Sequence, residues 1–378
     1  MSVNEGMPGQ QSAAASPAGK MHIALGYRWD PPDGRHWGGM EAVFRAQGHK
    51  VTFVGPPDGS RRGYNGMMPV DQLISQLPEM PDFYLWLDRN GYFPPGIEKV
   101  PVPTACWVGD VHLGTAWRQQ VAGFFDVVFI AQKDYLEGFR RAVGHDQVHW
   151  LSWGAGPYLK PTLDVPRIYD VGFVGNIVWA HRNTGRVRRL ALLAERYGTN
   201  DLYHHYPLQE VADVYSQSRI VFNVSIAGDV NLRVFEGTAC GALVLTDSVA
   251  NGLGDLFRLG DELVVYDDDA DLVSKIDYYL AHEDERARIA TAGLERTRSE
   301  HLFVHRVKAL MDTMMGASIE RSAPMRVADR EEREKARRDV LTHMHMLDAI
   351  LDESRAAGYS RPKRTWLALP CLARRLLL

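Results

Sequence analysis

Short runs of apolar residues alternate with segments of helical periodicity from Met21 to about residue 160. Near-continuous apolar runs are typical of parallel strands that are buried on both faces of a sheet. Helical segments between such strands indicate an open α/β sheet. The predicted strands are 21–27, 49–55, 82–88, 103–109, 126–131 and 148–153, and the predicted helices are about 35–48, 70–77, 114–123 and 133–143.

The same pattern begins again at Tyr169, after a Gly- and Pro-containing stretch at 154–161 of the kind that joins domains. It predicts a second α/β sheet. Its predicted strands are 169–175, 219–224, 242–246 and 262–266, and its predicted helices are 184–197, 207–217, 231–240, 270–281 and 284–314. We therefore expect two domains in series, at 20–158 and 159–315.

Both ends of the chain differ from this pattern. Residues 1–19 lack an apolar core and are predicted to be a disordered tail. The extension 316–378 contains a charged, then amphipathic stretch at 325–351 that predicts one long helix. Its basic tail, 361–378, contains two prolines, which argues against one continuous helix and favours packing on the N-terminal domain. Weak contact with an anionic membrane surface and formation of an oligomer stay open.

The composition is that of an ordinary globular protein, with 45% hydrophobic and 24% charged residues among 378. The net charge of −4 gives no general attraction for nucleic acid, so no nucleic-acid partner is expected. The three cysteines lie far apart without metal-ligand spacing. No apolar run approaches the roughly 18 residues of a membrane span. These features predict a cytoplasmic protein.

One acid, Glu236, lies within a small and apolar stretch, 230–247, that reads VNLRVFEGTACGALVLTD. Arg233 lies three positions earlier and shares its helix face. Arginine can clamp phosphate oxygens, and a carboxylate can accept from both hydroxyls of a ribose. Gly237 and Thr238, which come next, would allow close backbone approach and donate hydrogen bonds. The stretch therefore predicts a grip for a ribose and a diphosphate that needs no metal or other cofactor.

Residues 231–247 resemble the donor-binding stretch of GT-B glycosyltransferases, and most of all that of the spore-maturation-type (CgeB-like) family. The stretch 170–176 with the following Arg182, the stretch 203–225 and the stretch 301–306 resemble other parts of the same family. The resemblance covers about 165–310 in motifs and 20–160 only in overall pattern.

The resemblance implies an α/β protein of GT-B fold, with two Rossmann-like domains facing a central cleft and a C-terminal helical extension. It also implies transfer of a sugar from a nucleotide diphosphate sugar to an acceptor hydroxyl of unknown identity. The implied donor-binding residues are Gly175, Asn176, Arg182, Tyr203, His204, Arg233, Glu236, Gly237 and Thr238. Glu236 would hold the ribose and Arg233 would face the diphosphate. Many retaining members carry another Glu eight positions earlier, where this chain has Gly228 beside Asp229, so the stereochemical outcome stays open.

Two loops at strand ends of the first domain are candidates for acceptor binding and catalysis. The loop 27–39 offers Trp29, Asp30 and Trp37, whose aromatic and polar groups suit a sugar. The loop 107–114 offers Asp110 and His112 as a base and its orienting group. The alternative for Asp110 is that it caps the helix that follows.

Three clusters suggest metal binding but favour structural explanations. Asp267–Asp269 fits a turn and a helix N-cap, HMHM at 343–346 fits an exposed helix, and His301 with His305 lacks a third ligand. No metal site is expected. Two other functions remain as alternatives: a nucleotide-sugar epimerase of the same fold, and a non-catalytic nucleotide-sugar-binding or scaffold protein.

Overall fold

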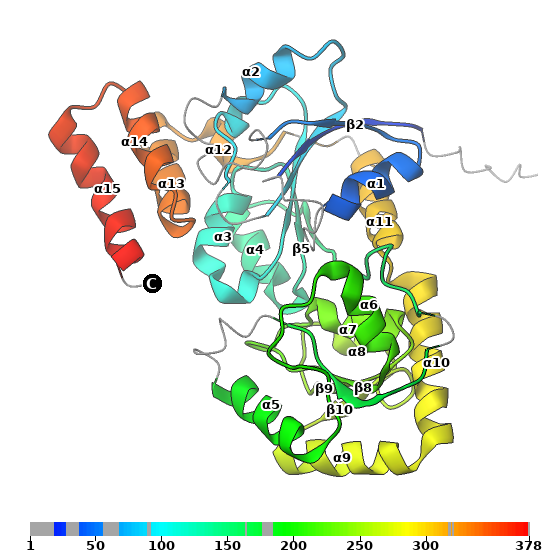
Figure 1. Ribbon diagram of the computed structural model, residues 1–378. Helices are drawn as coiled ribbons and strands as arrows, with labels where there is room; N and C mark the ends of the chain where they lie inside the picture. Colours follow the sequence, from blue (N-terminus) through cyan, green and yellow to red (C-terminus); the bar gives the residue numbers. More distant parts are fainter. Residues whose placement is uncertain are drawn as a thin grey trace, which may run out of the picture.

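The computed structural model describes residues 19–27, 38–55, 68–88, 92–162, 165–175, 184–316, 319 and 321–376. Each of two lobes is built on a parallel sheet covered by helices, and the C-terminal helices α13 Arg330–His343, α14 Leu347–Ala356 and α15 Arg361–Leu376 lie beside the first lobe (Figure 1). The strands of the first sheet are β1 His22–Gly26, β2 Lys50–Phe53, β3 Phe83–Leu87, β4 Thr104–Val108, β5 Val127–Ile130 and β6 Val148–Trp150. Their order across the sheet is β2-β1-β3-β4-β5-β6, and every pairing is parallel.

The second sheet has the order β10-β9-β8-β7, again with parallel pairing only. Its strands are β7 Tyr169–Gly172, β8 Ser218–Phe222, β9 Leu243–Asp247 and β10 Val264–Tyr266. All ten strands fall within the predicted ranges or one residue beyond them. Residues of β1, β3, β4 and β5 are buried throughout, and nearly all of them are apolar on both faces. The exceptions, His22 and Thr104, form side-chain hydrogen bonds.

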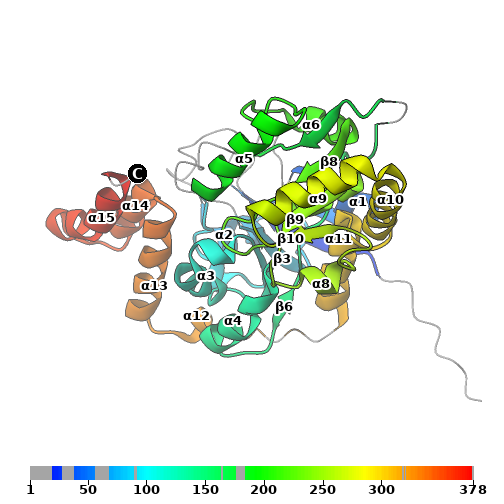
Figure 2. The same ribbon diagram turned by 90° about the horizontal axis from the view of Figure 1, so that it is seen from below.

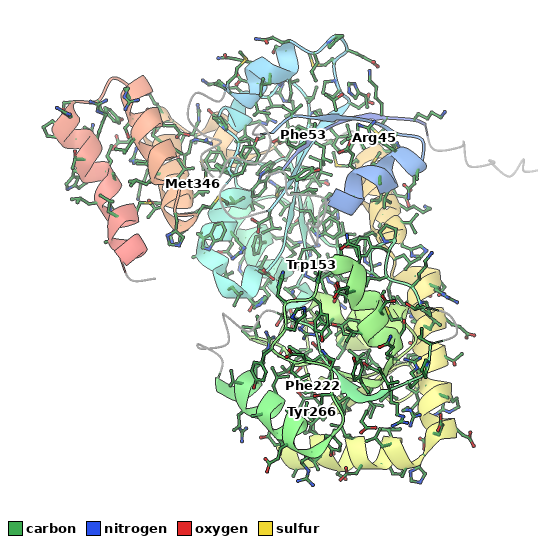
Figure 3. The ribbon with its side chains drawn as sticks, in the orientation of Figure 1. Arg45, Phe53, Trp153, Phe222, Tyr266 and Met346 are labelled. Atoms are coloured by element: carbon green, nitrogen blue, oxygen red, sulfur yellow. The ribbon has the colours of Figure 1, made fainter. Side chains whose placement is uncertain are left out.

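The helices of the two lobes cover these sheets close to the predicted positions. They are α1 Gly38–Ala46, α2 Val70–Ser75, α3 Thr115–Ala122, α4 Leu136–Val143, α5 Thr184–Arg196, α6 Leu208–Ser216, α7 Leu232–Ala239, α8 Leu253–Leu256 and α9 Asp269–Ala281. Short 3₁₀ turns lie at η1 Ile97–Lys99, η2 Val111–Leu113 and η3 Lys133–Tyr135. In the second lobe Phe222 and Tyr266 stack in the core, with ring centroids 6.0 Å apart (Figure 3).

The stretch 284–314, predicted as one helix, forms two: α10 Glu283–Glu300 and α11 Phe303–Gly316. The break is tertiary in origin, because Ala155 N–H donates to His301 O and Phe303 N–H donates to Ala155 O. Arg306 also donates from Nε to the carbonyls of Ser152 and Trp153, at 2.9 Å each. Consequently α11 leaves the second lobe and packs against α1 of the first (Figure 1).

The C-terminal extension is also broken where the sequence predicted one long helix. It forms α12 Pro324–Val327, α13 Arg330–His343, α14 Leu347–Ala356 and α15 Arg361–Leu376. The HMHM stretch, predicted as an exposed helix, is a turn in which Met344 and Met346 are buried and His345 has a φ of 57°. Burial of the Met344 and Met346 side chains stabilises the turn relative to a continued helix.

The C-terminal extension packs on the first lobe through α13, while its tail, which was predicted to pack on that lobe, packs mainly on α13 and α14. Helix α13 packs on α3, as Figure 2 also shows. Arg326 pairs with the buried Asp126 at 2.7 Å, and Arg337 donates to Pro94 O at 2.9 Å. Pro370 lies inside α15 without ending it, contrary to the sequence prediction. A proline removes one backbone donor, and the burial of Leu367, Ala368 and Cys371 offsets that loss. Within the described chain, no helix is long and apolar enough to cross a bilayer.

Candidate functional site

The carboxyl ends of strands from both sheets meet where the two lobes face each other. In the first lobe, Asp88 follows β3 and Asp110 follows β4. Chain order reverses between β1 and β3, and ligands of open α/β sheets bind outside the strand ends at such a point. His112, in η2, lies opposite the second lobe, with Nε2 3.8 Å from Asp229 Oδ1. This meeting of strand ends is the candidate site.

Asp110 occupies a strained position at the edge of this site. Its φ of 40° is unusual for a residue with a side chain, and that side chain makes no capping hydrogen bond to η2. The capping explanation for Asp110 is therefore not supported. Although the residue is accessible to solvent, desolvation of its carboxyl by the surrounding protein raises the pKa of that group. The negative charge of Asp229 makes a smaller contribution in the same direction. Burial raises the pKa of neighbouring Asp88 too, although Arg118 lies 3.2 Å from it.

His112 is enclosed at the junction of the lobes. Its side chain is only 1% exposed, and neither ring nitrogen forms a hydrogen bond within the described chain. A buried imidazole without hydrogen bonds is costly unless a ligand or a titrating partner uses it. Asp229, whose side chain is 4% exposed, is the acid within ion-pair distance of it. The sequence had paired His112 with Asp110; the tertiary structure adds Asp229, from the other lobe.

Contacts across the lobe junction hold the loop that carries Asp229. Within that loop, Ile226 N–H donates to Asp229 Oδ1 at 2.8 Å. From the first lobe, Gln132 Oε1 accepts from Val230 N–H at 3.3 Å. Asn251 donates from Nδ2 to Gly228 O at 2.6 Å. Asn251 also exchanges two hydrogen bonds with Asp134, at 3.2 and 3.0 Å, and so ties this loop to the first lobe.

Arg233, in the first turn of α7, holds neighbouring segments of the second lobe in place. Asn231 caps α7 by accepting from Arg233 N–H, and the Arg233 guanidinium lies 4.1 Å above the Phe173 ring. Its Nε donates to Val174 O at 3.0 Å and its Nη1 donates to Asn223 Oδ1 at 2.6 Å. The side chain is therefore engaged with the loop after β7 and the end of β8. These contacts give Arg233 a positioning role, and the predicted contact of its guanidinium with a diphosphate stays a prediction.

Gly175 is required by the same contact. A Cβ at Gly175 would overlap Nη2 of Arg233, so a larger residue would displace either the loop or the guanidinium. The loop Val174–Gly175 is also held by Tyr215, whose hydroxyl donates to Val174 O at 3.2 Å. Gly175 therefore lets the Arg233 side chain approach the backbone of this loop, and its contact with the donor stays a prediction.

Arg186, in the first turn of α5, is a candidate that the sequence reasoning missed. It is 5% exposed, and its Nη2 donates to Val224 O at 3.0 Å. Burial and the nearby charge of Arg233 lower its pKa to about 10, while Asp229 and Asp247 act in the opposite direction. Arg186 lies in the first turn of α5 and Arg233 in the first turn of α7. Two neighbouring guanidinium groups at such helix starts form a site that favours an anion. The sequence feature that could have identified Arg186 is the group of basic residues Arg186, Arg188 and Arg189. On a helix that packs against a sheet, one member of such a group can face the interior of the lobe.

Glu236 is half-buried on the same face of α7 as Arg233. Burial raises the pKa of Tyr215, and the negative charge of Glu236 contributes to the rise. Burial and then Glu236 likewise raise the pKa of the Cys240 thiol. The negative charge of Glu236 thus acts on Tyr215, the residue that holds the Val174–Gly175 loop. The contact of Glu236 with a donor ribose stays a prediction.

Gly237 and Thr238 face away from the cleft. A Cβ at Gly237 would lie 2.7 Å from Val244 Cγ2, so this glycine lets α7 pack closely on the sheet. The Thr238 hydroxyl is buried and bonds to Thr297 Oγ1 at 2.7 Å and to Val234 O at 2.9 Å. This geometry corrects the donor contact that the sequence suggested for both: they join α7 to the sheet and to α10.

Tyr203 and His204, two of the implied donor-binding residues, lie in a turn ahead of α6. Tyr203 is 57% exposed, and the His204 ring meets Tyr206 edge to face with centroids 4.6 Å apart. Both are open to solvent, and their contact with the donor stays a prediction. Five other predicted residues lie outside the described residues: Trp29, Asp30, Trp37, Asn176 and Arg182.

The clusters that resembled metal sites have structural roles. Asp268 caps α9 by accepting from the N–H groups of Ala270 and Asp271, as predicted. His301 is buried, its Nε2 lies 2.7 Å from Leu256 O, and burial lowers its pKa to about 4. Across the part of the chain that the structure describes, no three or more His, Cys, Asp or Glu side chains gather as metal ligands would.

Comparison with known proteins identifies the fold. Residues 172–312 match the family described as glycosyl transferase-like. The structure resembles HepE from Anabaena in complex with UDP-glucose, with a TM-score of 0.55 at 12% identity, over 79% of this chain and 100% of that one.

Two further structures cover the same shares of the two chains. Sucrose-phosphate synthase from Thermosynechococcus elongatus has a TM-score of 0.51 at 12% identity. A UDP-forming α,α-trehalose-phosphate synthase from Burkholderia xenovorans has a TM-score of 0.52 at 11% identity. No curated protein matches the chain. The likenesses confirm the predicted GT-B fold with its helical extension.

Proposed function

We propose that the protein is a glycosyltransferase that moves a sugar from a nucleotide diphosphate sugar to a hydroxyl group of an acceptor. The observation that carries this proposal is the arrangement across the lobe junction. Arg186, Arg233 and Glu236 lie around the strand ends of the second lobe, and Asp110 and His112 lie at those of the first. The family match over 172–312 covers the second of these lobes and supports the same reading.

In the proposed donor complex, Glu236 accepts from the ribose hydroxyls and Arg186 faces the diphosphate. Arg233 keeps the Val174–Gly175 loop in place and adds positive charge. The bond between the sugar C1 and the phosphate oxygen breaks, and the nucleoside diphosphate leaves with the electron pair. The two guanidinium groups offset the developing negative charge, as preorganised cations do in other transferases. The proposal assigns this task to the chain itself, without a metal ion.

On the acceptor side, the hydroxyl oxygen forms the new bond to C1 and its proton is transferred to His112. Asp229 then stabilises the charged imidazolium, since the two groups lie 3.8 Å apart. Asp110, exposed at the edge of the site, binds another acceptor hydroxyl in this scheme. Closure of the lobes around both substrates excludes water from the transfer.

The first experiment is a calorimetric titration of the purified protein with UDP, GDP, dTDP, ADP and CMP, in the presence of EDTA. We expect tight binding of one diphosphate and weak binding of the monophosphate, because one phosphate group satisfies less of the Arg186 and Arg233 charge. UDP is the first choice because HepE was solved with UDP-glucose. If every nucleotide fails to bind, with and without Mg²⁺, the proposal is wrong. Binding that appears only with Mg²⁺ would remove its metal-free part.

Replacing Asn251 with alanine is expected to lower kcat about ten-fold while changing donor affinity less than two-fold. The change removes both side-chain bonds of Asn251, from its Nδ2 to Gly228 O and from Asp134 N–H to its Oδ1, so the Asp229 loop is held less firmly to the first lobe. The bond from the Asn251 backbone N–H to Asp134 remains. A ten-fold loss corresponds to about 1.4 kcal/mol in the transition state. Steady-state kinetics and calorimetry measure the two quantities.

A matched control for this variant is Asp255→Asn, which breaks the pair with Lys133 across the same junction. Both of those side chains are substantially exposed, at 39% and 51%, so their pair contributes little and wild-type rates are expected. Equal effects of Asn251→Ala on kcat and on donor affinity would contradict the proposed role of the junction.

A further inference from the structure

The outer side of α15, the last helix of the extension, exposes large apolar side chains. Trp366 is 67% exposed, Leu369 is 50% exposed and Leu372 is 38% exposed. They follow each other at intervals of three residues, so they line one side of the helix. A tryptophan that exposes two thirds of its surface beside two leucines is unusual on a soluble surface and indicates an interaction face.

The opposite side of α15 is already occupied. Leu367, Ala368 and Cys371 are buried there, and the helix packs on α13 and α14. Figures 1 and 2 both show α15 at the outer margin of the molecule, beyond those two helices. The exposed side chains therefore belong to a helix whose orientation is set, and they point away from the rest of the chain. Continuation of the helix through Pro370 is what brings Trp366 and Leu372 onto one element.

The charge of this segment differs from that of the whole protein. Residues 361–378 contain five basic side chains and no acidic one, while the chain as a whole carries 43 basic and 47 acidic residues. Arg361 and Lys363 are exposed at the start of α15, next to Trp366 in the helix. An apolar stripe with tryptophan, flanked by cations, is the pattern of a helix that lies in the surface of an anionic bilayer.

We propose that the outer side of α15 binds the surface of an anionic lipid bilayer, with Trp366 and Leu369 entering the interface and Arg361 and Lys363 contacting lipid phosphates. A nucleic acid would use the cations but would leave the leucines exposed to water. A second copy of the chain would bring equal positive charge to the same face. The bilayer alone satisfies both the apolar and the charged parts. This inference goes beyond the proposed sugar transfer and does not depend on it.

The test is flotation of the full-length protein with vesicles of phosphatidylcholine, and with vesicles in which about one third of the lipid is phosphatidylglycerol. We expect binding to the anionic vesicles, weak binding to the neutral ones, and release at about 0.5 M salt. The double change Arg361→Gln/Lys363→Gln should lower partitioning roughly five-fold for each cation removed. Trp366→Ser/Leu369→Ser should lower it at least ten-fold, and the blue shift that anionic vesicles cause in the tryptophan fluorescence of the wild type should be lost in this variant.

Matched controls change similar groups elsewhere. Leu259→Ser/Tyr278→Ser replaces exposed apolar residues of the second lobe, and Arg141→Gln/Arg298→Gln removes two exposed cations. Both should bind vesicles like the wild type, and circular dichroism should show that every variant is folded. Equal binding to neutral vesicles would overturn the proposal, and so would vesicle binding that is unchanged in the α15 variants. A wild-type dimer that the Trp366→Ser/Leu369→Ser change dissociates, with no binding to vesicles, would overturn it as well. Salt-sensitive binding of duplex DNA without binding of anionic vesicles would also overturn it.

Discussion

The change Glu236→Ala is expected to weaken binding of the preferred nucleoside diphosphate by roughly ten- to hundred-fold. A charged hydrogen bond contributes about 1.5–3 kcal/mol, and the alanine removes the acceptor that the ribose hydroxyls would use. Because Glu236 is only half-buried, its loss should leave the thermal unfolding temperature nearly unchanged. Calorimetric titration of wild type and variant measures the effect directly.

Two companion variants separate ribose binding from packing. Glu236→Gln keeps the shape of the side chain and one acceptor, so it should lose less affinity than alanine does. Glu210→Ala removes an exposed acid from the first turn of α6 and should bind like the wild type. Unchanged affinity in Glu236→Ala would mean that the donor does not use the face of α7 that carries Arg233, and the site assignment would fail.

His112→Ala should lower kcat by about 10²–10⁴-fold, the range that a positioned base contributes, while donor affinity changes little. His112 lies on the first lobe and the proposed donor contacts lie on the second, so the two measurements separate the roles. Single-turnover transfer assays with the cognate donor and a panel of hydroxyl acceptors give the rate. Loss of donor binding in His112→Ala would instead indicate a structural role at the lobe junction.

His145 provides a matched control for that variant. Both of its ring nitrogens are also buried without hydrogen bonds among the described residues, but it follows α4 and precedes β6, at the amino ends of the strands. His145→Ala should therefore keep its rate within about two-fold. Asp229→Asn should also lower kcat, and combining it with His112→Ala should add little further loss, because groups that act as a unit are not additive.

The positions of the strands could be predicted from the sequence because most of them are covered on both faces. Such coverage favours apolar residues at nearly every position, as in β3 and, after their first residues His22 and Thr104, in β1 and β4. The resulting runs are visible in a single sequence. The restart at Tyr169 predicted the second sheet in the same way. The N-cap at Asp268 was also predictable, since the bonds of a cap reach only two or three residues along the chain.

The residues of the candidate site were only partly predictable. Glu236, Arg233 and Asp110 could be selected from local spacing, because each lies just after a strand or on one helix face. The direction of a side chain was not predictable in the same way. Thr238 follows Glu236 by two residues, yet its hydroxyl is bonded to Thr297 of α10. Arg186 was missed because its neighbours Arg188 and Arg189 are also basic, and which one faces inward depends on how α5 lies on the sheet.

The sequence by itself determined what short-range physics controls: two parallel sheets, their helices, the capping turn and the position of Asp110 and His112 just after β4. Tertiary structure decided what depends on contacts between distant segments. The break at His301 comes from Ala155, continuation of α15 through Pro370 comes from packing on α13 and α14, and the approach of His112 to Asp229 comes from the junction of the lobes. The first and third of these contacts join residues more than a hundred positions apart, and the second joins separate helices of the extension. Local patterns do not show which partner supplies the compensating hydrogen bond or buried surface.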